Sequence, residues 1–88
     1  MSLVAQARAS ALRLIHRLAP ESPWVHAQLG RAYGAAGREV LAMRHFREAL
    51  RLERDHVPSL VGLAHSLVRQ GRSSEAVPLY SRAMQQRP

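Results

Sequence analysis

Few side chains in this sequence could do chemistry, and their spacing matches none of the common catalytic or metal-binding patterns. No two of the five histidines lie four residues apart, so no predicted helix carries the paired imidazoles of a zinc site. The sequence has only six acidic residues, no glycine-rich phosphate loop and no nucleophile motif. Cysteine is absent, which excludes disulfides, thiolate metal ligands and cysteine nucleophiles. We therefore expect no enzymatic activity, no cofactor and no bound metal.

Arginine is the one charged residue type that is present in quantity. All 13 basic residues are arginine, and the net charge of +7 should attract acidic partners, including acidic peptide segments and nucleic acid. The other interpretation is that the arginines simply coat helix surfaces that face solvent. The complete absence of lysine fits a GC-rich genome, so we expect a bacterial protein.

Neither a membrane span nor an export signal is predicted. No apolar run approaches the roughly 18 residues that a membrane-spanning helix needs. Arg8 and Arg13 interrupt the N-terminal region, where a signal peptide would have an apolar core. We expect a cytoplasmic location and no membrane partner.

The composition favours a single all-α domain. A chain of 88 residues supports one small domain, and its hydrophobic content of 47% argues against disorder. Alanine and leucine are abundant, which favours helices over strands. The few aromatic residues are Trp24, Tyr33, Phe46 and Tyr80.

Five helices are predicted from apolar spacing and from start and stop signals. The first four span about residues 3–18, 23–36, 38–53 and 58–70, and the last continues to about residue 86. Apolar residues spaced three and four apart form one face of the first helix, at Leu3, Ala7, Ala11, Leu14, Ile15 and Leu18. Ser22 is predicted to cap the second helix. Gly37 and Gly71 are predicted to end the second and fourth helices through left-handed turns.

The start of the last helix is predicted to be irregular. Ser73 or Ser74 can cap it, but Pro78 removes one backbone hydrogen bond and crowds the preceding turn. The connections between all five helices are short, so we expect neighbouring helices to pack as antiparallel hairpins.

A repeat of 34 residues organises these helices. The stretch Leu29–Leu50 has a weaker copy at Leu63–Met84. The paired residues are Leu29 and Leu63, Gly30 and Ala64, Gly37 and Gly71, Arg38 and Arg72, Ala42 and Ala76, Phe46 and Tyr80, and Ala49 and Ala83. A fixed period of this size is typical of stacked helix–turn–helix repeats.

The pattern resembles the tetratricopeptide repeat over nearly the whole chain. The matching residues are Leu29, Gly30, Tyr33, Gly37, Ala42, Phe46, Ala49, Leu63, Ala64, Gly71, Ala76, Tyr80, Ala83 and Pro88. The chain departs from the family where His26 replaces a tryptophan, Arg54 a proline and Leu67 a tyrosine. The resemblance implies one all-α domain of helix hairpins, stacked as a short right-handed superhelix. Its parts would be a half repeat at 1–22 and repeats at 23–56 and 57–88.

The resemblance also implies a function, because the first helix of each repeat in this family lines a concave groove for a peptide or helix of another protein. Carried onto this sequence, the groove residues are Trp24, Ala27, Arg31, Gly34 and Ala35, then Pro58, Val61, His65, Val68 and Arg69. We expect partner contacts at Trp24, Ala27, Arg31, His65 and Arg69. The arginines and the histidine could bind a carboxylate or a phosphate, so the expected partner includes acidic segments.

Structural roles remain open for these residues, and so do two other functions. Trp24 could simply pack against the first helix, and the groove arginines could simply be solvated. Nucleic acid or another polyanion could bind an arginine cluster around the third helix, at Arg38, Arg44, Arg47, Arg51 and Arg54. Against this, acidic residues are interleaved and few aromatics are available to stack on bases.

Self-association is the third possibility. In the last helix, Val77, Tyr80 and Met84 have no following repeat to cover them, and repeat arrays normally need a capping helix there. We expect either that the natural chain continues beyond Pro88 or that this face pairs with a second copy as a homodimer.

Overall fold

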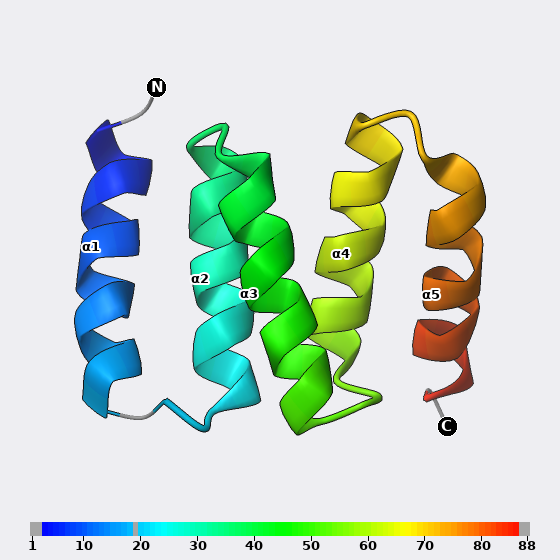
Figure 1. Cartoon of the computed structure of the whole chain (residues 1–88), viewed down its shortest axis with the longest axis horizontal. Coiled ribbons are helices and arrows are strands. Elements are labelled where there is room, and N and C mark those ends of the chain that lie inside the picture. Colours follow the sequence, from blue (N-terminus) through cyan, green and yellow to red (C-terminus); the bar gives the residue numbers. More distant parts are fainter. Residues whose placement is uncertain (1–2, 19, 87–88) are drawn as a thin grey trace.

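The structure, a computed structural model, describes residues 3–18 and 20–86, the side chains of Ala5 and His16 excepted. These residues form five helices and no strand: α1 (Leu3–Leu18), α2 (Pro23–Ala35), α3 (Glu39–Leu52), α4 (Val57–Arg69) and α5 (Ser73–Gln85). The helices stand side by side in chain order, with α1 and α5 at the two ends of the row (Figure 1). The predicted all-α fold is confirmed. The predicted bounds of the first four helices, and the predicted last residue of the fifth, are within one residue of those observed.

Two glycine turns of the same design close the hairpins. Gly37 and Gly71 are the only described residues with positive φ, at 79° and 75°, as predicted for left-handed turns. After α2, the Arg38 amide donates to the Tyr33 carbonyl at 2.8 Å, and the Gly37 amide donates to the Gly34 carbonyl at 3.0 Å. This pair of bonds is the Schellman motif, and the turn after α4 repeats it. Each turn satisfies carbonyls that the helix end would otherwise leave unpaired.

The helix starts follow the predictions in one case and depart from them in another. The Ser22 side chain caps α2 by accepting from the Val25 amide at 3.2 Å. At α5, however, the cap position is Arg72, which makes no side-chain capping bond, so the predicted serine cap is wrong. The helix also runs unbroken through Pro78. Ser74 and Pro78 are both exposed, so water can reach the Ser74 carbonyl that loses its amide partner.

The core is built around Phe46, whose ring lies against two glycines. An ideal Cβ on Gly30 would lie 2.7 Å from the ring, and one on Gly62 would lie closer still. Phe46 is only 2% exposed, and the most completely buried large side chains are Leu29 and Leu60. The absence of side chains at two helix positions therefore lets an aromatic residue of α3 fill the space between α2 and α4.

A second buried layer joins α2 to α3 through aromatic and imidazole rings. His26, at the family's tryptophan position, is 4% exposed, and its Nε2 lies 3.1 Å from the Pro20 carbonyl. Its Nδ1 lies 3.1 Å from Nδ1 of His45, so one ring must donate and the other accept. The His45 ring in turn stacks on Tyr33, with centroids 5.5 Å apart. His26 thus takes the packing role of the missing tryptophan.

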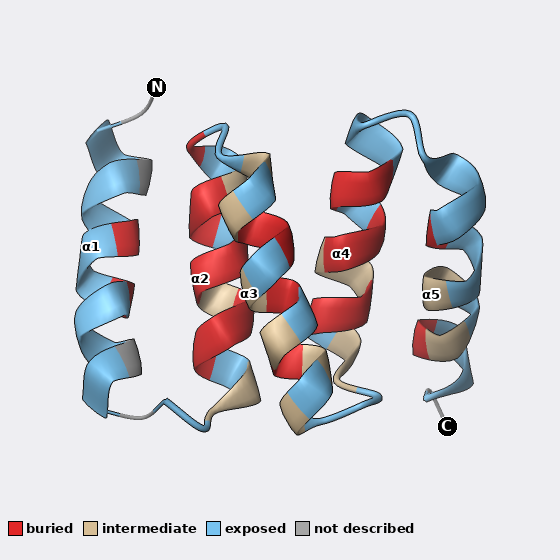
Figure 2. Cartoon of the chain, viewed as in Figure 1, coloured by how far each residue is buried: buried red, intermediate tan, exposed pale blue. Residues whose placement is uncertain are grey.

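The first helix is attached to the rest through α2 alone. Its described buried side chains are Ala9 and Leu12, which face α2, whereas most of its remaining surface is exposed (Figure 2). The apolar face predicted from the sequence therefore lies on the outside of the molecule. None of the described helices is long and apolar enough to cross a lipid bilayer.

Candidate peptide-binding groove

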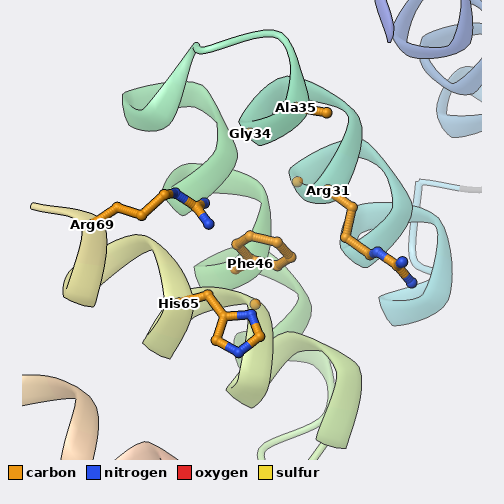
Figure 3. Close-up of a pocket in the computed structure, with 8 residues that line it drawn as sticks. Arg31, Gly34, Ala35, Phe46, His65 and Arg69 are labelled. Atoms are coloured by element: carbon orange, nitrogen blue, oxygen red, sulfur yellow. The ribbon is translucent and has the colours of Figure 1, made fainter.

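A cavity of about 340 Å³ opens between α2 and α4, over the ring of Phe46. Its lining residues come from three helices: Gly30, Arg31, Gly34 and Ala35 of α2, Phe46 of α3, and Gly62, His65 and Arg69 of α4. Figure 3 shows Arg31 and Arg69 on opposite sides of Phe46, with His65 beside it. We call this feature the α2/α4 groove.

The floor of the groove is apolar and follows directly from the helix sequences. Three glycines line the groove, and the Phe46 ring lies over two of them, Gly30 and Gly62. The Phe46 ring, supplied from behind by α3, fills the middle. Because Phe46 is only 2% exposed, a ligand side chain entering here would meet a small part of the ring together with Gly34 and Gly62, which suits an apolar group.

The rim of the groove carries two arginines, one of which is already paired with a carboxylate and one of which is not. Arg69 is held by α3, since its Nη2 donates to both carboxylate oxygens of Glu39 at 2.9 and 3.2 Å. The same nitrogen lies 3.2 Å from the Ser66 hydroxyl. Arg31 is exposed and forms no hydrogen bond or ion pair with any described residue. Arg31 is therefore the guanidinium that can bind an incoming anion without first leaving another partner.

The imidazole of His65 stands at the α4 edge of the groove. Its side chain is exposed, and its ring lies 5.7 Å from that of Tyr80 on α5, tilted by 55°. Because its ring nitrogens form no hydrogen bond with any described residue, they can donate to or accept from a ligand, depending on the tautomer. Tyr80 itself is half-buried behind His65, which steadies the ring from the α5 side.

The structure brings five of the predicted groove residues together around one cavity. Arg31, Gly34, Ala35, His65 and Arg69 all line it, as their helical spacing suggested. Three lining residues were not predicted from the sequence: Gly30, Phe46 and Gly62. The two glycines had a readable signal, because a glycine within a helix often marks a close approach of another group.

Other predicted groove residues lie elsewhere. Ala27 is fully buried, so it has no surface for a partner in this fold. Trp24 is 56% exposed and does not line the cavity, although it lies two turns before Arg31 on the same side of α2. Pro58 and Val68 are exposed and Val61 is half-buried, but none of the three lines the cavity.

The arginines considered for nucleic-acid binding do not all line one depression. Three of them, Arg44, Arg47 and Arg51, line a shallow depression on the outer side of α3 with Val40 and Glu48. Arg51 is occupied there, because it bonds Glu48 at 2.6 Å, and this bond raises its pKa above the ordinary value. Arg38 instead lies over the Tyr33 ring, 5.9 Å from its centroid. The carbonyl of Arg54 accepts from Arg82 of α5.

At the far end of the row, the last helix presents a small apolar patch. Val77 is 61% exposed and Met84 is 73% exposed, while Tyr80 is half-buried.

Among the residues whose side chains the structure describes, no group of three or more histidine, cysteine or acidic residues could hold a metal ion.

Comparisons with known proteins find the same fold in solved structures. No protein-family model matches the sequence, and no curated protein does. Solved MamA structures do match. MamA AMB-1 gives a TM-score of 0.83 at 25% identity, over 94% of this chain and 49% of that one. MamA MSR-1 gives a TM-score of 0.81 at 25% identity, over 92% of this chain and 47% of that one. MamA 41-end from Desulfovibrio magneticus RS-1 gives a TM-score of 0.85 at 17% identity, over 92% of this chain and 46% of that one.

The chain thus spans about half the length of these solved chains. MamA is a tetratricopeptide-repeat protein, so the predicted fold class and the resemblance to that repeat are confirmed.

Proposed function

We propose that this chain, whose fold is that of a tetratricopeptide-like helical repeat, is a protein-interaction module that holds an acidic peptide or helix in the α2/α4 groove. The observation that carries the proposal is the composition of the groove. An aromatic floor lies between two arginines on different helices, and one of these, Arg31, has no partner among the described residues. An apolar side chain in the cavity and a carboxylate on Arg31 could therefore be bound at the same time.

The net charge supports an acidic partner over a neutral one. The chain carries +7, so an acidic segment would be attracted before contact and would associate faster at low salt. Trp24 extends the same side of α2 and offers an exposed aromatic anchor, of the kind that often dominates interface energy. A bound segment would therefore run along α2 from the cavity toward Trp24.

A selection experiment tests this function with random peptides in place of the natural partner. A phage-displayed library of random 12-residue peptides is panned against the intact chain and, in parallel, against an Arg31→Glu variant. We expect the wild type to enrich peptides that combine an aromatic or apolar residue with Asp or Glu, and the variant to bind them at least tenfold more weakly. Failure to enrich any peptide, or enrichment of peptides that bind the variant equally well, would refute the proposal.

A second candidate is polyanion binding on the outer side of α3, because three arginines share one depression there. Arg44 and Arg47 are exposed and make no side-chain hydrogen bond to described residues. Fluorescence anisotropy with a labelled 30-nucleotide RNA decides this alternative. Steep loss of affinity between 50 and 200 mM salt, reduced by an Arg44→Ala, Arg47→Ala double variant, would support it. An RNA that stays unbound at 50 mM salt would eliminate it.

A further inference from the structure

The outer side of α1 carries an uncovered apolar stripe. Its large side chains are strongly exposed: Leu3 82%, Val4 77%, Leu14 55%, Ile15 41% and Leu18 81%. Ala7 and Ala11 are exposed between them. At about 100° per residue these seven residues span roughly 120° of the helix, opposite the side that packs on α2. We call this surface the α1 stripe.

The spacing of the α1 stripe is that of a helix–helix contact. Val4, Ala7, Ala11, Leu14 and Leu18 follow one another at intervals of three, four, three and four residues. This repeat makes the seam along which two helices pack. Exposed apolar surface organised in this way marks an interaction site.

The order of small and large residues along the stripe indicates which kind of helix can pack against it. The small residues, Ala7 and Ala11, lie in its first half, and the large ones, Leu14 and Leu18, in its second half. In an antiparallel pair whose facing residue numbers sum to about 25, Ala7 meets Leu18 of a second copy, and Ala11 meets Leu14 of that copy. Two-fold symmetry then gives four layers, each with one large and one small side chain. A parallel pair would instead set alanine on alanine and leave gaps.

We propose that α1 pairs antiparallel with α1 of a second copy through the α1 stripe. The charges permit this arrangement. Arg8 and Arg17 flank the stripe, and in this register they lie beside Ile15 and Ser10 of the second copy, not beside each other. Arg13 is turned back toward the protein, where it donates to the Tyr33 hydroxyl at 3.2 Å.

The dimer formed in this way should be weak and should respond to salt. One helix face about 22 Å long buries less than the roughly 1,200–2,000 Å² of a standard stable interface. Each copy also carries a net charge of +7, so the two copies repel each other at long range. Salt screens this repulsion, and raising the ionic strength should therefore tighten the dimer, the reverse of what polyanion or anionic-lipid binding would show.

Sedimentation equilibrium of the intact chain, from about 5 to 500 µM, measures the association. We expect the average mass to rise from that of one chain toward that of two, and to rise further when salt is increased from 50 to 300 mM. Leu14→Glu should weaken the dimer at least tenfold, and because Leu14 is exposed, circular dichroism should remain unchanged. Met84→Glu, also at an exposed apolar residue but at the other end of the row, is the control and should dimerise as the wild type does.

Cysteine cross-linking tests the register, because the natural chain has no cysteine. Under mild oxidation, a mixture of Ala7→Cys and Leu18→Cys chains should form disulfide-linked heterodimers several times faster than either variant forms homodimers. Faster homodimer formation by each variant alone would indicate a parallel pair and would overturn the proposal.

Three further results would also overturn it. One is a monomer at every concentration. Another is a dimer that Met84→Glu disrupts and Leu14→Glu does not, which would assign self-association to α5. The third is a monomer whose α1 stripe binds vesicles containing anionic phosphatidylglycerol, which would make a lipid surface the occupant.

Discussion

Phe46 is the residue on which both the core and the groove depend. Its ring comes from α3, is almost fully buried, and ends against Gly30 and Gly62 on the two groove helices. A residue with a side chain at either glycine would have to push the ring out of place. The same contact therefore sets how closely α2 and α4 approach and what lies at the bottom of the groove.

Adding one methyl group beside Phe46 should destabilise the fold. We expect Gly62→Ala to lower the free energy of unfolding by about 1–3 kcal/mol, because the Cβ would overlap the ring. Gly34→Ala is the control, since its Cβ would meet only ordinary contacts at 3.4 Å and beyond. It should be neutral or stabilising by up to about 1 kcal/mol through helix propensity. Urea unfolding followed by circular dichroism measures both, and equal effects would contradict the role given to the ring.

Arg69 differs from Arg31 in already having a carboxylate partner. Glu39→Gln removes that charge but keeps the shape, and the pair is partly exposed, so we expect a loss of less than about 1 kcal/mol in stability. If acidic segments bind in the groove, the same variant should bind a selected acidic peptide several times more tightly, because Arg69 is no longer shared. Glu48→Gln breaks the Arg51 pair outside the groove and should leave peptide affinity unchanged. Isothermal titration calorimetry of both variants with the selected peptide measures these affinities.

At the scale of elements, the glycine turns decide where each hairpin folds back. A Cβ at Gly37 would meet no atom within 4 Å, so the cost of Gly37→Ala is purely that of the left-handed backbone. We expect it to lower stability by about 1–2 kcal/mol. Asparagine tolerates this conformation better, so Gly37→Asn should cost less than alanine. Thermal unfolding of the two variants tests the order, and a harmless alanine would contradict the observed φ.

The start of α5 is stabilised by an ion pair instead of a serine cap. Arg72 bonds both carboxylate oxygens of Glu75, at 2.7 and 2.8 Å, and this lowers the pKa of Glu75 below its ordinary value. A lowered pKa means that this contribution is present above the pKa of the unfolded chain and is lost as the pH falls through the folded value. Carboxyl NMR titration should show that Glu75 titrates low in the wild type and nearer its ordinary range in Arg72→Gln.

The elements show which parts of the fold the sequence could predict. Glycine adopts positive φ without a steric penalty, so Gly37 and Gly71 could be predicted as turns directly from the sequence. The apolar spacing of α1 identified residues that share a face, but periodicity alone does not say which side packs on the protein. Among the described side chains, Ala9 and Leu12 pack toward α2, and the stronger apolar face lies outside.

The groove belongs to the whole molecule, and sequence predicts such a site only in part. Helical spacing placed Arg31 and Arg69 on the sides of α2 and α4 that line the cavity, because each placement needs only its own helix. Phe46 and Gly62 come together from different helices, so their roles at the floor depend on packing that a linear pattern does not contain. Ala27 was placed in the groove by the same spacing, but it is fully buried in the packed structure.

A titration of the ¹⁵N-labelled chain with an acidic, aromatic-containing peptide taken from the phage selection tests the central claim most directly. We predict amide shift changes concentrated at Arg31, Gly34, His65 and Arg69, on the facing sides of α2 and α4, and their loss in Arg31→Glu. Changes confined to the outer side of α3 or to the α1 stripe, or changes that persist in the variant, would contradict peptide binding in the α2/α4 groove.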